Sequence, residues 1–142
     1  MSQVKLSPEK WVADQARLYE ESGGTQGTTM GSSPCLLLDV QGRTSGQWHR
    51  TVLIYGRDGQ DYLIVASAGG SDLHPQWYRN LSVNPRVRLR VETQRFEADA
   101  RTLSSADKAR VWPHLVDVFA PYADYQAKTQ RDIPVVALRP VE

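Results

Sequence analysis

The stretch that decides the fold is TVLIYGRDGQDYLIVA, residues 51–66. Two runs rich in β-branched and aromatic residues, 51–55 and 62–66, flank a short polar segment. Such runs are typical of β-strands, and the Asp58-Gly59 dipeptide between them is a strong short-range signal for a tight hairpin turn. The stretch therefore predicts two antiparallel strands joined by a hairpin.

Four more strands are predicted on either side of this hairpin. An apolar run precedes it at 35–40, and two segments that alternate between polar and apolar residues follow it at 87–91 and 96–100. Strict alternation is typical of half-buried antiparallel strands. A last apolar run at 133–138 brings the predicted number of strands to six.

Three helices are predicted around these strands. The first, 8–21, has the apolar spacing of an amphipathic helix and ends at two glycines. The second spans about 75–83, and the third opens with a capping box at Ser104 and runs toward 119. Pro113 lies inside the third helix, where we expect it to cause a kink or a break.

The order of the elements decides the fold class. Strands and helices do not alternate regularly, which disfavours a parallel sheet of the Rossmann type. A small antiparallel barrel, closed or partly split, with helices packed outside it, fits this mainly β (α+β) chain. Gly, Thr and Ser dominate residues 22–33, which reads as a mobile linker. We therefore expect an amphipathic helix and flexible linker at 1–33 and a barrel domain at 34–142.

Composition limits the classes of function. The chain has 142 residues with a formal net charge of +1, which gives no broad attraction to nucleic acid or to an anionic membrane. One cysteine and three histidines without metal-ligand spacing predict no metal site. The N-terminus lacks the layout of a secretory signal, and no apolar run is long enough to span a membrane, so the sequence predicts a cytoplasmic protein.

Loops and one helical turn carry the residues suited to chemistry. The segment 42–50 offers guanidinium, hydroxyl and imidazole groups that suit a phosphate, and 66–70 has small residues that let a flat ligand approach the backbone. Composition alone favours ordinary loops in both places. Residues 74–78 include two adjacent aromatic side chains, and these suit either the wall of a pocket or the hydrophobic core. Tyr122 and Tyr125, one helical turn apart, suit a substrate oxygen or a proton transfer, although packing is the commoner explanation.

Taken in order along residues 34–140, these motifs resemble one enzyme family. The motifs are Gly42-Arg43-x-Ser45-Gly46, Val65-Ala66-Ser67-x-Gly69-Gly70, His74-Pro75-x-Trp77-Tyr78-x-Asn80-Leu81, Asn84-Pro85 and Pro121-Tyr122-x-x-Tyr125-Gln126-x-x-Thr129. The ordered set is similar to that of the deazaflavin-dependent nitroreductase and quinone reductase family of actinobacteria. The resemblance implies a six-stranded antiparallel split β-barrel, like that of FMN-binding split-barrel proteins, with flanking helices.

The same resemblance implies an oxidoreductase that uses coenzyme F420, an 8-hydroxy-5-deazaflavin. The reduced coenzyme would pass a hydride to an electron-poor acceptor such as a quinone, an enone or a nitro compound, and the protein would supply orientation and a proton source. Two other classes stay open: a related split-barrel reductase or oxidase that uses FMN, and a non-catalytic carrier of a deazaflavin or a lipid-like ligand.

The resemblance also implies which residues form the site. The loop from Arg43 would meet the phosphate and the tail of the coenzyme, residues 49–54 would run under it, and 65–68 would present backbone groups to the deazaflavin ring. Tyr122, Tyr125 and Ser67 are the implied catalytic residues. The implied coenzyme-binding residues are Arg43, Thr44, Ser45, His49, Arg50, Thr51, Val52, Leu53, Ile54, Val65, Ala66, Ser67, Ala68, Gln76, Trp77, Tyr78, Arg79, Asn80 and Tyr122.

Some positions depart from the family pattern. Thr44, Gln47 and His49 stand where family members often carry Lys or Arg, and Ala68 stands where some carry Lys. Because each charge-assisted hydrogen bond contributes about 1.5–3 kcal/mol, we expect a weaker hold on the anionic tail of the coenzyme.

The partners expected from the sequence are few. A small-molecule electron acceptor is expected and nucleic acid is not, while a monomer and a homodimer both stay open. We expect the helix 8–21 to cover the barrel mouth as a lid, with Trp11, Leu18 and Tyr19 facing what it covers. A weak contact with the inner face of the plasma membrane is the alternative, although the helix carries more acidic than basic groups.

Overall fold

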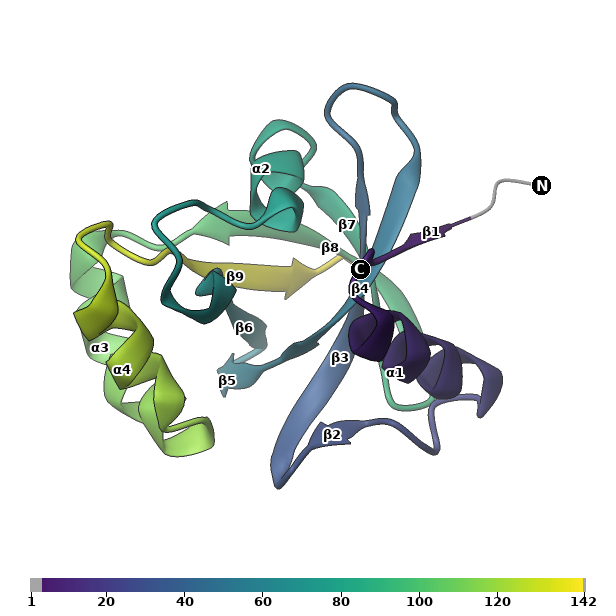
Figure 1. The fold of residues 1–142 in the computed structure, drawn as a ribbon, viewed down its shortest axis with the longest axis horizontal. Coiled ribbons are helices and arrows are strands. Elements are labelled where there is room, and N and C mark those ends of the chain that lie inside the picture. Colours follow the sequence, from purple (N-terminus) through teal and green to yellow (C-terminus); the bar gives the residue numbers. More distant parts are fainter. Residues whose placement is uncertain (1–3, 142) are drawn as a thin grey trace.

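The computed structural model describes residues 4–141 and shows an α+β fold dominated by one large sheet (Figure 1). Its strands run in the order β1-β4-β3-β7-β8-β9-β6-β5, and β2 pairs with β3 beside this path. The strands are β1 (Lys5–Leu6), β2 (Thr29–Met30), β3 (Ser33–Gln41), β4 (Trp48–Ile54), β5 (Gly56–Asp58), β6 (Asp61–Val65), β7 (Arg86–Val91), β8 (Gln94–Thr102) and β9 (Val135–Pro140).

The predicted number of six strands is too low, since the described residues form nine. The six predicted strands correspond to the six longest, and the additional β1, β2 and β5 have only two or three residues each. An alternating pattern cannot reveal a strand this short. The predicted barrel is also not closed, because within residues 4–141 no ladder joins β4 to β6 and the sheet stays open between β1 and β5.

The hairpin turn forms where the sequence predicts it, but it joins different strands. Asp58 pairs with Asp61 across the turn, and Gly59 has the positive φ of +59° that this turn requires. The first strand of the hairpin is β5, whereas β4 pairs with β3. The exchange of partners occurs at Tyr55, whose N–H donates to the carbonyl of Pro34 at 3.1 Å before the chain turns to β6.

The helices are more numerous than the three predicted. The N-cap at Ser104 is confirmed, since its hydroxyl accepts a hydrogen bond from the N–H of Asp107 at 3.2 Å, and the helix runs on past Pro113 without a break. No helix within 4–141 is both long and apolar enough to cross a membrane. The helices are α1 (Lys10–Glu21), the one-turn 3-10 helix η1 (Ala68–Gly70), α2 (Gln76–Val83), α3 (Ser105–Val118) and α4 (Pro121–Lys128), of which η1 and α4 are not among the three predicted.

Buried side chains form two clusters, one on each face of the sheet. Along β3, Cys35 and Leu37 belong to the first cluster, and Leu36 and Leu38 belong to the second, as alternation along a strand requires. Helices α1, α3 and α4 add side chains to the first cluster, whereas α2 adds Leu81 to the second. The sheet therefore separates α2 from α1, α3 and α4 (Figure 1).

Helix α1 packs on the sheet through a face other than the one predicted. Val12, Ala16 and Tyr19 are buried in the first cluster, but Trp11 and Leu18 are 58% and 44% exposed. Leu18 lies about 100° round the helix from Tyr19, because one turn takes about 3.6 residues. The expectation that Trp11, Leu18 and Tyr19 are all covered is therefore wrong for Trp11 and Leu18.

Tyr19 anchors α1 to the turn between β7 and β8. Its hydroxyl lies 3.1 Å from the carbonyl oxygen of Cys35 and 3.3 Å from that of Arg90, and it accepts a hydrogen bond from the N–H of Glu92 at 2.6 Å. Gly24 then passes against the same turn with a φ of +84°, so close that an added Cβ would stand 1.8 Å from the carbonyl oxygen of Glu92. The division of the chain at residue 33 stays a prediction.

Replacement of Tyr19 by phenylalanine is expected to lower the free energy of unfolding by about 1–3 kcal/mol, the cost of leaving a buried polar group without a partner. The N–H of Glu92 loses its acceptor in this variant. Urea unfolding followed by tryptophan fluorescence measures the change. Tyr55→Phe is the matched control, because the Tyr55 hydroxyl makes no hydrogen bond with the described residues. Equal unfolding midpoints for the two variants would contradict the anchoring role.

Candidate active site

Arg43 ties the loop 42–47, between β3 and β4, to helix α2. Its backbone N–H donates to the Oδ1 of Asn80 at 3.2 Å, and its Nη1 donates to the same atom at 2.7 Å. Its Nη2 donates to the Oε1 of Gln76 at 2.9 Å. The structure thus brings three of the predicted coenzyme-binding residues together, and the remaining N–H groups of the guanidinium stay available to an anion.

The loop 42–47 itself presents further hydrogen-bond donors. Gly42 closes its base, since its N–H donates to the carbonyl of Gln47 at 2.8 Å. The hydroxyl of Ser45 accepts from the N–H of Gln47 at 3.1 Å. The backbone N–H groups of Thr44 and Ser45 have no acceptor among residues 4–141. Free N–H groups beside a guanidinium form the kind of cradle that holds a phosphate.

Residues 66–70, which follow β6 and are called the ring loop below, form a second group of donors. Ala68, Gly69 and Gly70 have positive φ angles of 46°, 63° and 84°. The N–H groups of Ser67, Ala68 and Gly69 have no acceptor in the described part of the chain. A Cβ added to Gly69 would meet nothing within 4 Å. The loop is therefore open on the side of Gly69, and its free N–H groups suit the heteroatoms of a flat ring.

His74 links the ring loop to α2. Its ring centroid lies 4.9 Å from that of Tyr78, and its Nδ1 lies 3.1 Å from the Nη1 of Arg131. Burial lowers the pKa of His74, and the charges of Arg131 and Arg79 lower it further. A neutral His74 accepts the hydrogen bond from Arg131, a residue that the sequence analysis missed. Arg131 also donates to the carbonyls of Ala66 and Ser67 in the ring loop, so a chain of contacts joins the loop 42–47, α2 and the ring loop.

Tyr122 and Tyr125 lie on α4 with ring centroids 6.5 Å apart. Tyr122 is buried in the first cluster, which also contains Val52, Ile54 and Val65. Burial raises the pKa of Tyr122, so its hydroxyl stays protonated at neutral pH. This hydroxyl bonds to none of the described residues, and yet it is not sealed from solvent.

Residues 49–54 do not all face the same side. His49, Thr51 and Leu53 alternate along β4 with Arg50, Val52 and Ile54, so one ligand cannot contact all six side chains. Among the remaining predicted residues, Trp77 and Tyr78 pack against the second cluster, and Arg79 is exposed.

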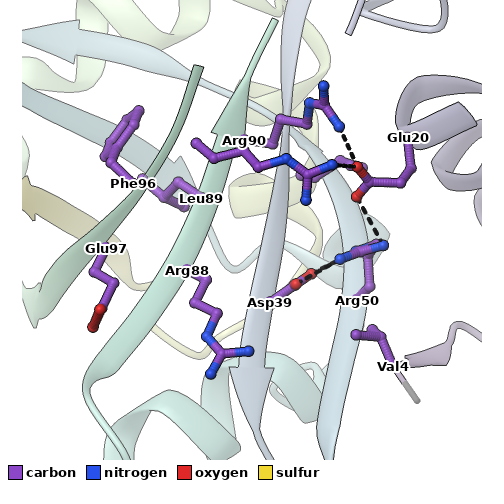
Figure 2. A pocket seen from close by; sticks show the side chains of 11 residues that line it. Val4, Glu20, Asp39, Arg50, Arg88, Leu89, Arg90, Phe96 and Glu97 are labelled. Atoms are coloured by element: carbon purple, nitrogen blue, oxygen red, sulfur yellow. Dashed lines mark hydrogen bonds and ion pairs between the residues drawn. The ribbon is translucent and has the colours of Figure 1, made fainter. Parts of the chain in front are cut away.

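Arg50 faces a hollow of about 440 Å³ (Figure 2). It donates to both carboxylate oxygens of Asp39 at 2.7 and 2.8 Å and pairs with Glu20 of α1 at 3.0 Å. Glu20 also pairs with Arg90 and Arg95. Among the described residues that line this hollow, Arg50 is the sole predicted site residue. The structure therefore sets Arg50 in an ion-pair network that joins α1 to the sheet.

Comparison with known proteins identifies the family. The family model of F420H(2)-dependent quinone reductase matches residues 11–140. The chain belongs to this family. Within it, the F420H(2)-dependent quinone reductase of Mycobacterium tuberculosis strain H37Rv is 41% identical over 125 residues, which cover 85% of this chain and 84% of the relative. The family resemblance inferred from the sequence motifs is confirmed.

Two solved structures, each 34% identical in sequence, share the fold of this family member. One is an F420-H2-dependent reductase, with a TM-score of 0.70 and coverage of 75% of this chain and 94% of that chain. The other is a domain-swapped dimer, with a TM-score of 0.72 and coverage of 94% and 100%.

Proposed function

We propose that this protein catalyses the reduction of a quinone-type acceptor by reduced coenzyme F420. The chain belongs to this family, and one observation supports the proposal for it. Two groups of free backbone N–H donors, in the loop 42–47 and in the ring loop, are joined through α2 into one site. The first group and Arg43 suit a phosphate, and the second suits a flat heteroaromatic ring. When bound, the reduced deazaflavin supplies the hydride.

The residues of the chain hold and orient the coenzyme. Arg43 and the N–H groups of Thr44 and Ser45 bind its phosphate. The two backbone N–H groups have no acceptor among residues 4–141, and the Arg43 guanidinium keeps N–H groups beyond those that bond to Asn80 and Gln76. The N–H groups of Ser67 and Ala68 bind the heteroatoms of the ring. The open position over Gly69 lets the ring approach the backbone closely.

The tyrosines act on the acceptor side in this proposal. Tyr122 holds the oxygen of the acceptor through its hydroxyl, which is protonated at neutral pH as in any tyrosine, and burial raises its pKa further. Tyr125 on the same helix covers the neighbouring wall. Either hydroxyl, or the Ser67 hydroxyl, is a proton donor once the acceptor oxygen gains negative charge; solvent is the alternative donor.

The remaining parts of the proposal concern the fold, the assembly and the location of the protein. We propose that the open sheet is a split barrel of six long strands, on the support of the solved structures with the same overall fold. A homodimer is compatible with the domain-swapped relative. The cytoplasmic location and the weak membrane contact of α1 stay predictions.

The choice of coenzyme is directly testable. We expect the purified protein to oxidise reduced F420 when menadione is present, with the absorbance and fluorescence of oxidised F420 returning, and we expect no oxidation of NADPH. Titration with FMN is the control, since an FMN enzyme would bind it and show a flavin spectrum. Oxidation of NADPH in the absence of any effect on F420 would refute the proposed function.

A further inference from the structure

The guanidinium of Arg131 is directed entirely at the ring loop and the residues beside it. Its Nη2 donates to the carbonyl oxygens of Ser67 at 2.8 Å and of Ala66 at 3.1 Å. Its Nε donates to the carbonyl of Ser71 at 2.7 Å, and its Nη1 lies 3.1 Å from the Nδ1 of His74. One side chain thus fixes both ends of the ring loop.

The backbone of Arg131 is held by two residues of the sequence motif that ends at Thr129. The N–H of Arg131 donates to the Oγ1 of Thr129 at 3.3 Å, and its carbonyl accepts from the Nε2 of Gln126 at 2.8 Å. The Oε1 of Gln126 also accepts from the N–H of Ile133 at 3.0 Å. Thr129 in turn donates to Asp72 at 2.7 Å. Arg131 is therefore set in place before any ligand binds.

The contacts of Arg131 decide where the free donors of the ring loop point. In a trans peptide group the N–H points away from the C=O of the same group. Because the carbonyls of Ala66 and Ser67 both point to Arg131, the N–H groups of Ser67 and Ala68 point to the opposite side. The positive charge also polarises these two peptide groups, which strengthens their N–H groups as donors.

We propose that Arg131 is a positioning residue for the coenzyme ring, acting through the peptide groups 66–67 and 67–68. The inference rests on the proposed function and adds to it the residue that aims the ring-binding donors. His74 supports the same arrangement as a neutral acceptor for Nη1.

The test compares Arg131→Met with Arg110→Met. Arg110 forms an exposed surface pair with Asp58 and contacts no part of the ring loop, so it is the matched control. Fluorescence titration with F420 is expected to give a dissociation constant about fivefold to tenfold higher for Arg131→Met, where tenfold corresponds to about 1.4 kcal/mol. With saturating reduced F420, the KM for menadione is expected to stay unchanged. Arg131→Lys is expected to recover part of the affinity, because the lysine ammonium group keeps the charge and three N–H donors but not the planar fork of the guanidinium.

A second measurement does not depend on the coenzyme. Amide hydrogen exchange of the protein alone is expected to be faster at Gly70 and Ser71 in Arg131→Met, since their N–H groups bond to carbonyls within the loop that Arg131 orders. An unchanged F420 affinity in Arg131→Met, or an equal rise in the KM for menadione, overturns the proposal. If the unaltered protein binds no F420, the proposed function fails; unchanged exchange at these amides would then overturn the ordering role of Arg131 separately.

Discussion

Replacement of Gly24 by alanine is expected to lower the free energy of unfolding by about 3 kcal/mol, the largest effect expected of a single methyl group among the described residues. The added Cβ would stand 1.8 Å from the carbonyl oxygen and 2.3 Å from the carbonyl carbon of Glu92. These are backbone atoms, which cannot rotate away, so α1 or the β7–β8 turn must shift. Overpacking of this kind costs about 1–3 kcal/mol, and an L-residue in the left-handed region costs roughly 1–2 kcal/mol more.

Gly31→Ala isolates the conformational part of this cost. Gly31 has a comparable φ of +58°, but an added Cβ there would meet nothing within 4 Å. We expect this variant to lose only about 1 kcal/mol. Denaturant unfolding of the two variants measures the difference, and equal losses would show that the close approach of Gly24 to Glu92 does not determine stability.

The second large effect is expected on coenzyme binding. Arg43→Ala should raise the dissociation constant for F420 at least about tenfold, or 1.4 kcal/mol, because a charged hydrogen bond to the phosphate is lost. Stability should change little, since Arg43 is exposed and its backbone N–H still donates to Asn80. Fluorescence titration measures the affinity, and thermal unfolding checks the fold.

Two further variants sharpen this test. Gln76→Ala removes one of the two side chains that hold the Arg43 guanidinium, so a smaller loss of affinity is expected from poorer positioning alone. Arg110→Ala removes an exposed arginine far along the chain, on α3, and should leave the affinity unchanged. An affinity for F420 that Arg43→Ala does not alter would make the loop 42–47 an ordinary surface loop.

The sequence predicts those parts of the fold that depend on local patterns. The six long strands follow from their apolar runs and alternation, and α3 follows from the cap at Ser104. The exchange of partners at Tyr55 could not be predicted, because it depends on which strand lies on each side of β4 and β5 in space. The exposure of Trp11 and Leu18 was missed for the related reason that amphipathic spacing marks two neighbouring apolar stripes without saying which one the sheet covers.

For the site, the motifs predict the loops but not what holds them. Arg43, Gln76 and Asn80 stand in separate motifs, and the structure brings them into contact. Arg131 does not belong to a comparable motif, and a single arginine before a strand does not by itself indicate a site. Its contacts are with residues some 60 positions earlier in the chain, and only the fold brings them within reach.

The position of β9 in the sheet determines when the sheet can be completed as the chain folds. This strand, the last of those in residues 4–141, lies between β8 and β6 and pairs Leu138 with both Tyr62 and Ala100. Until residues 135–140 leave the ribosome, β6 and β8 each carry an unsatisfied edge, the kind of surface that invites pairing with other chains. The entropy cost of closing such long loops must be met before the strands can pair, so we expect the sheet to be completed late and chains that lack β9 to expose both edges to aggregation.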